Sequence, residues 1–285
     1  MPAYTTDDFT MHYEVHGEVH GGIPVILIMG ITAPNTVWEA HVEVWSKQFH
    51  CITPDNRGVG QSDKPPGDYS SAMMADDYAN LMDGLGIEKA HVIGCSMGSI
   101  IGQQLALRHP EKVQSLVLMC SWARCDEYAK STFEHMKQAK AHLTPAAFME
   151  WIQLLIFHKR SWDDPETYQS MLDGRQDASK DPNPQPLHGL HGQAAACINH
   201  NTLDELKNLN APCLVIGGEG DIFTPRWMAE EIVAELPNSE MHLYPDSGHA
   251  FHRENLEDFN KRVIGFVRGS SEQFGVNRQS LTANR

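Results

Sequence analysis

The sequence contains no long apolar run. Its two strongest, residues 24–29 and 113–119, are far shorter than the roughly 20 residues that cross a bilayer as a helix. The amino-terminal stretch has no basic segment followed by an apolar one, which a secretory signal requires. These absences predict a cytoplasmic protein that neither spans a membrane nor is secreted.

Basic residues are scarce. The chain has 22 lysines and arginines against 37 aspartates and glutamates, which gives a formal net charge of −15. Nucleic acids and anionic membrane surfaces are bound through basic patches. The charge balance therefore argues against nucleic acid and against a membrane as partners.

Paired cysteines and metal-binding spacings are also missing. The six cysteines include no C-x-x-C pair, and the sixteen histidines include no H-E-x-x-H or similar spacing. The cysteines stand at positions 51, 95, 120, 125, 197 and 213. We therefore expect reduced, mostly buried thiols, no disulfide framework and no metal site.

What the 285 residues do contain is an alternation of short apolar runs with helical patterns. Strands are predicted at residues 25–29, 51–53, 91–94, 113–120, 213–217 and 240–244. Helices are predicted at residues 37–49, 72–85, 97–108, 225–236 and 254–267. Repeated strand–helix units predict an α/β fold, a mostly parallel twisted sheet with helices on both faces.

One long segment breaks this alternation. Helical stretches at residues 145–158 and 194–206 flank the polar sequence S-K-D-P-N-P-Q-P, and no strand-like run occurs among them. The segment is therefore predicted to be a helical cap inserted into the core, and the polar C-terminal tail is expected to be poorly ordered. The predicted units are residues 1–121 and 209–268 for the core, 122–208 for the cap and 269–285 for the tail.

The sequence G-C-S-M-G, from Gly94 to Gly98, follows a predicted strand and opens a predicted helix. This setting is typical of a nucleophile elbow, in which a strained turn lifts a serine hydroxyl above the sheet. The two glycines allow the strand and the helix to approach closely. Ser96 is thus the candidate nucleophile, at a helix N-terminus that favours negative charge. Its neighbour Cys95 should point away and pack as a small buried residue.

A serine nucleophile needs a base that a carboxylate orients. Asp221 and His249 each follow a predicted strand, so their loops should lie at the sheet edge that carries Ser96. Glu219 and His252 are rivals for these two roles. Asp221 is preferred because the sequence I-F-T-P after it starts a helix and fixes its loop, and His249 because His252 falls at the start of the last helix.

An oxyanion hole requires two backbone N–H donors. Met97, which follows the candidate nucleophile, supplies one, and Ile31, in the loop after the strand at residues 25–29, supplies the other. Gly30 gives that loop conformational freedom.

Together these segments resemble the α/β-hydrolase superfamily. The shared patterns are D-N-R-G-V-G-Q-S, G-C-S-M-G, G-G-E-G-D-I-F-T-P and S-G-H-A-F-H-R-E. Within the superfamily, A-H-V-I-G-C-S-M-G is similar to serine esterases and to 3-oxoadipate enol-lactonase-like enzymes. The resemblance implies a triad of Ser96, Asp221 and His249, a helical cap over the pocket and no cofactor. Met29 stands where the family usually has a histidine before the glycine, which leaves open how the oxyanion loop is braced.

These features predict a soluble serine hydrolase that cleaves a small carboxylic ester or lactone through an acyl-enzyme. The same triad would serve hydrolysis of a C–C bond in a β-diketone or ring-fission product, and the scaffold would also suit a ligand sensor. The large apolar residues of the cap either line a pocket or form the cap's own core. The sequence leaves the oligomeric state open and is compatible with a dimer. The cap residues concerned are Trp122, Met149, Trp151, Leu154, Phe157 and Trp162.

Overall fold

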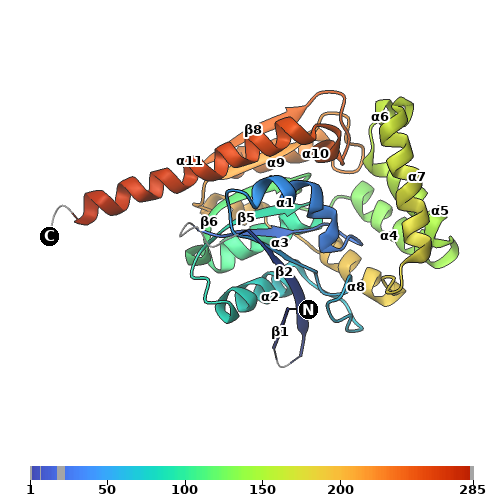
Figure 1. Ribbon diagram of the computed structural model, residues 1–285, viewed down its shortest axis with the longest axis horizontal. Helices are drawn as coiled ribbons and strands as arrows, with labels where there is room; N and C mark the ends of the chain where they lie inside the picture. Colours follow the sequence, from blue (N-terminus) through green and yellow to red (C-terminus); the bar gives the residue numbers. More distant parts are fainter. Residues whose placement is uncertain (1, 7, 18–22, 283–285) are drawn as a thin grey trace.

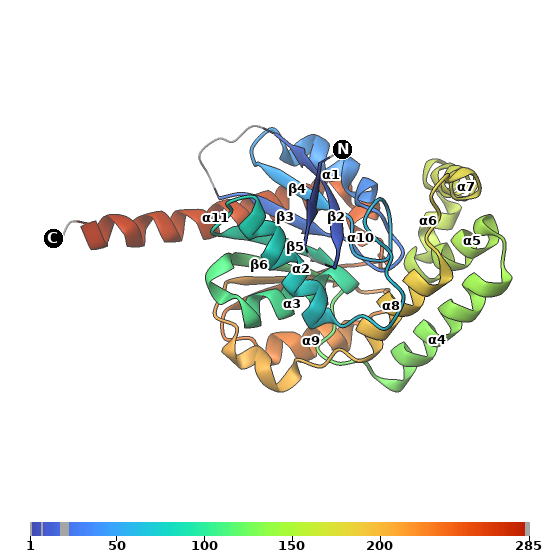
Figure 2. The same ribbon diagram turned by 90° about the horizontal axis from the view of Figure 1, so that it is seen from below.

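Eight strands form one mixed sheet at the centre of the molecule (Figures 1 and 2). The structure is a computed structural model that describes residues 2–6, 8–17 and 23–282. The strands are β1 (Ala3–Thr5), β2 (Thr10–His16), β3 (Val25–Ile28), β4 (Cys51–Pro54), β5 (Ala90–Cys95), β6 (Val113–Met119), β7 (Cys213–Gly218) and β8 (Ser239–Tyr244). Their order is β1-β2-β4-β3-β5-β6-β7-β8, and the pairs from β4 to β8 are parallel. The predicted α/β fold is confirmed.

Helices cover both faces of the sheet, which is why its central strands are buried. Side chains alternate along a strand, so that Ile26 and Ile28 of β3 enter one hydrophobic cluster and Val25 and Leu27 enter the other. The first cluster includes residues of α2 (Ser71–Gly84), α3 (Met97–Arg108) and α9 (Arg226–Glu235). The second includes residues of α1 (Glu39–Trp45), α10 (Phe251–Glu254) and α11 (Leu256–Thr282). The continuous apolar sequences of the strands reflect this burial on both sides.

The N-terminal hairpin of β1 and β2 was not predicted from the sequence. β2 pairs antiparallel with β1 and with β4, at the edge of the parallel strands. Only Met11 and His12 of its seven residues are buried. No apolar run therefore marks this strand, and its pairing with β4 stabilises a segment whose own composition is mixed.

Five helices lie between β6 and β7 and form the cap on one side of the core (Figure 2). They are α4 (Glu127–His142), α5 (Pro145–Ile156), α6 (Lys159–Asp163), α7 (Pro165–Lys180) and α8 (Leu187–Ile198). The sequence analysis missed α4 and α7. Both begin at aspartate N-caps, since Asp126 accepts the N–H of Ala129 and Asp164 accepts the N–H of Thr167.

The helix predicted at residues 194–206 has the wrong bounds. α8 starts earlier, at Leu187, and ends at Ile198. Beyond it, His200 and Thr202 turn inward and hydrogen-bond the side chain of Gln103 in α3, at 3.3 and 2.5 Å. These buried polar contacts with the core, rather than local helix propensity, decide where the helix stops.

α11 continues to Thr282, into the segment 269–285 that the sequence analysis expects to be poorly ordered, and residues 283–285 lie outside the described residues. In both ribbon views its last part extends away from the body (Figures 1 and 2). Gln114 of β6 donates a hydrogen bond to the carbonyl oxygen of Ser270 (3.0 Å). This bond links α11 to the sheet beyond residue 267, where the helix was predicted to end. Within the described part of the chain, neither α11 nor any other helix is long and apolar enough to cross a bilayer.

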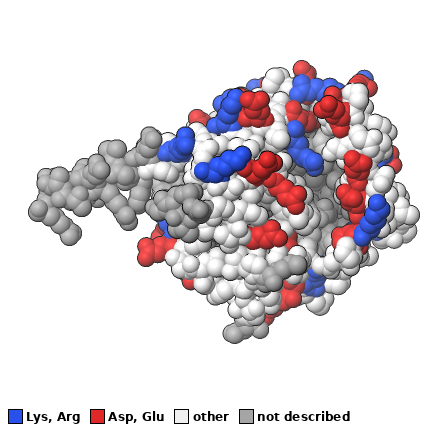
Figure 3. All heavy atoms as spheres, viewed as in Figure 1, with Lys and Arg blue, Asp and Glu red and all other residues white. Residues whose placement is uncertain are grey.

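Charged side chains of both signs are interspersed on the face seen in Figure 3. Lysines and arginines stand among aspartates and glutamates there and form no broad patch of one sign. This face therefore lacks the continuous basic surface that binding a phosphate backbone requires.

Candidate active site

Ser96 occupies the sharp turn between β5 and α3. Its φ of 54° and ψ of −118° are strained for a residue with a side chain. A Cβ on Gly94 would overlap the carbonyl group of Gly98, and a Cβ on Gly98 would overlap that of Ile28. The close approach of β5, α3 and β3 therefore requires glycine on both sides of the serine.

Asp221 and His249 form a hydrogen-bonded pair at the same edge of the sheet. Asp221 follows β7, His249 follows β8, and His249 Nδ1 lies 2.8 Å from Asp221 Oδ2. Asp221 Oδ1 accepts the backbone N–H groups of Phe223 (2.8 Å) and Thr224 (2.9 Å), and the Thr224 hydroxyl donates to Oδ2 (2.6 Å). The loop after Asp221 thus orients the carboxylate toward the imidazole.

The surroundings of His249 act on its pKa in opposite directions. Burial lowers the pKa, whereas the charge and the hydrogen bond of Asp221 raise it, and the net pKa of His249 lies above its ordinary value. The carboxylate therefore stabilises the imidazolium that would form when His249 accepts a proton.

The hydroxyl of Ser96 is buried and has no hydrogen-bond partner among the residues that the structure describes. The structure thus joins two of the three predicted triad residues and leaves the serine unbonded. A buried unpaired polar group costs about 1–3 kcal/mol, so it calls for a functional reason. Catalytic hydrogen bonds often shorten only once substrate is bound.

Gly30, which precedes the predicted donor Ile31, and the predicted donor Met97 both adjoin Ser96. A Cβ on Gly30, the residue before Ile31, would lie 3.3 Å from the Ser96 Cβ and 3.8 Å from its Oγ. Met97 is the first residue of α3, and an N–H at that position has no acceptor within the helix. The assignment of Ile31 and Met97 as oxyanion donors stays a prediction, which the closeness of both segments to Ser96 supports.

The predicted oxyanion loop is held by residues that the sequence analysis missed. The Asn56 side chain donates to the carbonyl oxygen of Met29 (2.8 Å), and Gln193 Oε1, from the cap helix α8, accepts the N–H of Thr32 (3.0 Å). Both side chains are buried. Gln193 and Thr32 are 161 residues apart in the chain, so no local pattern could reveal their contact.

The two rival residues make other contacts. Glu219 is 44% exposed and forms an ion pair with an arginine at the surface. His252 Nδ1 bonds His41 Nε2 (2.9 Å) within a buried aromatic cluster. Neither hydrogen-bonds the Asp221–His249 pair.

Two buried thiols lie next to the same pair. Cys120 Sγ donates to the carbonyl oxygen of His249 (3.0 Å). The neighbouring Cys120 thiol lowers the pKa of Cys95, while burial raises the pKa of Cys120 well above its ordinary value. Cys120, Asp221 and His249 place three atoms of metal-ligand type within 4.8 Å of one another. Two of these atoms, Asp221 Oδ2 and His249 Nδ1, are hydrogen-bonded to each other, and Cys120 Sγ bonds the backbone carbonyl oxygen of His249.

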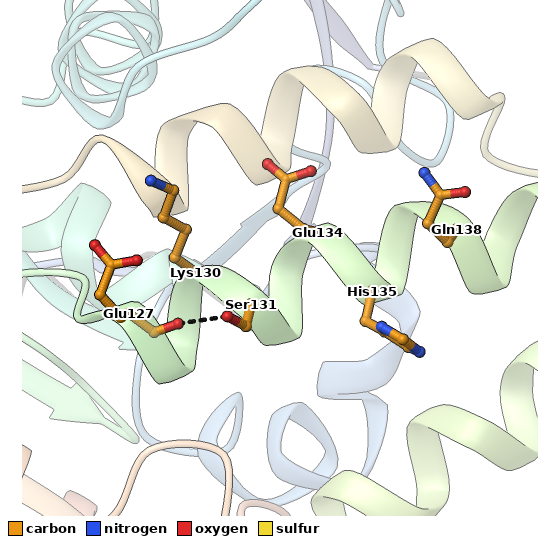
Figure 4. A pocket seen from close by; sticks show the side chains of 6 residues that line it. All are labelled: Glu127, Lys130, Ser131, Glu134, His135 and Gln138. Carbon is orange, nitrogen blue, oxygen red and sulfur yellow. Dashed lines mark hydrogen bonds between the residues drawn. The ribbon is translucent and has the colours of Figure 1, made fainter.

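A surface pocket of about 310 Å³ lies along α4, apart from these residues (Figure 4). Its lining side chains all come from that one helix and include no serine beside an oriented base. They are Glu127, Lys130, Ser131, Glu134, His135 and Gln138. The chemistry therefore favours the Ser96 site over this pocket.

A sequence model of the alpha/beta hydrolase fold matches residues 23–256, which span β3 through α10 and include all of the candidate site. The chain belongs to the α/β-hydrolase family. The resemblance stated from the sequence motifs is thereby confirmed.

Relatives of this α/β-hydrolase match nearly its whole length. A protein of Caulobacter segnis named "Putative carbamate hydrolase RutD" is 28% identical over 264 residues, which is 90% of this chain and 96% of that one. The solved structure of a thermophilic esterase from Thermogutta terrifontis is 25% identical with a TM-score of 0.82, and covers 95% of this chain and 100% of that one. Est816, described as an N-acyl homoserine lactone degrading enzyme, is 25% identical with a TM-score of 0.79, and covers 93% and 100%.

Proposed function

We propose that this α/β-hydrolase is a serine hydrolase that cleaves a small carboxylic ester or lactone. The observation that carries the proposal is the unpaired Ser96 hydroxyl on a strained elbow, at the sheet edge that holds the Asp221–His249 pair. The names of the similar proteins support a carbonyl substrate, since esters, lactones and carbamates all present a carbonyl carbon beside a leaving group.

In the proposed reaction, His249 Nε2 accepts the hydroxyl proton of Ser96 as Oγ attacks the substrate carbonyl carbon. The carbonyl oxygen becomes an oxyanion that accepts the N–H groups of Ile31 and Met97. Collapse of this intermediate breaks the bond to the alcohol, which takes the proton from His249 and leaves an acyl-serine. Water then gives a proton to His249 and attacks the acyl carbon; the bond to Ser96 Oγ breaks, Oγ takes the proton back from His249, and the acid is released. Asp221 remains ionised and stabilises the imidazolium in both halves.

A carbamate is the second candidate substrate, because relatives whose alignment covers 90% of this chain are named putative carbamate hydrolases. The same nucleophile, base and oxyanion donors would act on its carbonyl group. C–C bond hydrolysis and ligand sensing are the alternatives that arise from the sequence, and each makes a different prediction in the experiment below.

A panel of p-nitrophenyl esters, lactones, carbamates and β-diketones, assayed with the wild type and with Ser96→Ala, tests the proposal. We expect turnover of esters or lactones by the wild type and a loss of roughly 10⁶-fold in kcat for the variant, because the triad acts as a unit. Ser131→Ala is the matched control. This exposed serine on α4 donates a hydrogen bond to the carbonyl oxygen of Glu127, and its replacement should leave the activity unchanged.

Near-normal ester hydrolysis by Ser96→Ala would reject the proposal. Turnover confined to carbamates or to diketones would shift the substrate class to those compounds. Slow single-turnover hydrolysis with a persistent covalent adduct would favour the ligand sensor.

A further inference from the structure

The loop that carries His249 contacts the cap directly. Ala250, the residue after the histidine, donates its N–H to the carbonyl oxygen of Ile156 at the end of α5 (2.8 Å). On the other side of the histidine, a Cβ on Gly248 would lie 2.6 Å from the same oxygen and 2.8 Å from the nitrogen of His158. The cap segment at residues 156–161 therefore lies in close contact with the backbone on both sides of the candidate base.

The carboxylate of Glu254 joins this cap segment to the histidine loop. Its Oε2 accepts the N–H of Gly248 (2.8 Å), immediately before His249. Its Oε1 accepts the N–H of His158 (2.8 Å) and the hydroxyl of Ser161 (2.5 Å), both at the N-terminal end of α6. One side chain of α10 thus binds the core loop with one oxygen and the cap with the other.

We propose that Glu254 is a positioning residue that couples the position of the cap to the orientation of His249. The inference rests on the proposed function, because it concerns the base of that reaction. Gly248 is held through Glu254 and Ala250 through Ile156, so both neighbours of His249 depend on the cap segment. A base must be held within about 0.5 Å of its productive geometry, so displacement of the cap would misplace the imidazole relative to Ser96.

The donor arrangement requires a carboxylate at residue 254. Three donors converge on it, and an ionised carboxylate only accepts hydrogen bonds. In Glu254→Gln the amide NH₂ would face either Gly248 N–H or the cap donors, so one side of the bridge is lost while the size of the side chain is kept. Ser161→Ala removes one cap donor and leaves the bond to Gly248 intact.

The experiment measures kcat and KM for p-nitrophenyl butyrate together with the rate at which a fluorophosphonate labels Ser96. We expect Glu254→Gln to lower kcat and the labelling rate about tenfold with KM changed less than twofold, since misorientation of a base acts on the chemical step. Ser161→Ala should lower kcat about threefold, and the double variant should be no worse than Glu254→Gln because both act through one bridge.

Glu257→Gln is the matched control for charge. Glu257 is 86% exposed, its ion pair is with Lys261 on the same helix, and its loss should leave kcat unchanged. Wild-type kcat in Glu254→Gln would overturn the proposal. So would wild-type kcat in Ser161→Ala, which would show that the cap side of the bridge has no part. The serine variant removes only one hydroxyl, so it keeps the test decisive should Glu254→Gln not fold.

Failure of the proposed function looks different from failure of this inference. A wild-type protein whose Ser96 does not react with the fluorophosphonate would defeat both. Equal labelling rates in the wild type and in Glu254→Gln would defeat the positioning role alone.

Discussion

The sheet core and the cap contribute to the candidate site by different means. Every residue of β3, β5, β6 and β7 is buried, whereas α5 in the cap buries only Phe148 and Gln153 and leaves Leu154 56% exposed. The core thus places Ser96 and Asp221 through apolar burial of the strands that precede them. The cap contacts the site through individual polar side chains such as Gln193, which accepts a hydrogen bond from Thr32 N–H in the predicted oxyanion loop. Burial determines where the candidate catalytic groups lie, and hydrogen bonds at the boundary between core and cap determine how they are oriented.

After the loss expected for Ser96→Ala, the largest effect tests the core contribution. Asp221→Asn should lower kcat about 10⁴-fold, because an amide can hold His249 in the wrong tautomer and cannot stabilise the imidazolium. Kinetics with a p-nitrophenyl ester measure this loss. Asp173→Asn, at an exposed position of the cap helix α7, is the control and should leave kcat unchanged. A loss below tenfold in Asp221→Asn would assign the acid role elsewhere.

The next effect compares the stability of the two regions. Ile93→Ala in β5 removes a side chain that is 1% exposed and should lower the free energy of unfolding by about 2–5 kcal/mol. Leu154→Ala in α5 should change it by about 0.5 kcal/mol or less, since its side chain is largely in solvent. Urea denaturation measures both. Equal losses would remove the distinction between a buried core and a thinly packed cap.

A third effect depends on pH. Burial lowers the pKa of His41 and His91 in the core to about 4, and that of His200 at the base of the cap to about 3. In the unfolded chain these groups bind protons below about pH 6.5. The unfolded state therefore takes up more protons as the pH falls from 6.5 towards 4, and stability declines through that window.

The decline should amount to about 1–2 kcal/mol for each histidine at pH 5. Urea midpoints at pH 7.5 and pH 5 measure it. His91→Gln in the core should reduce the shift of the urea midpoint between pH 7.5 and pH 5. His200→Gln at the base of the cap should reduce the same shift. A midpoint that is the same at both pH values would contradict the expectation.

The smallest effect concerns the contact of the cap with the oxyanion loop. Gln193→Ala removes the acceptor of Thr32 N–H and should lower kcat about tenfold, with little change in KM, because the loop loses its brace. Gln169→Ala, at an exposed site on α7, is the control. Unchanged turnover in Gln193→Ala would mean that the core alone orients the loop.

Local patterns were sufficient for most of the fold. The apolar runs of the parallel strands and the glycines around Ser96 act over a few residues, and the predicted strands agree with the structure within one residue at each end. The hairpin of β1 and β2 and the helices α4 and α7 lack such runs and were missed. Asp221 and His249 were found as candidates because each follows a strand that ends at the same edge, whereas Asn56 and Gln193 carry no comparable signal.

By itself, the sequence determined the strand–helix alternation, the elbow at Ser96 and the membership of a hydrolase family. The reason is that hydrophobic periodicity and the need for glycine in a tight turn depend on residues that are close together in the chain. Only the tertiary structure decided which polar side chains brace the candidate site. The bonds of Gln193 to Thr32 and of Glu254 to the cap join residues 161 and 96 positions apart. Such pairs arise when helices and loops from distant parts of the chain come together, and burial then makes each unpaired donor or acceptor costly.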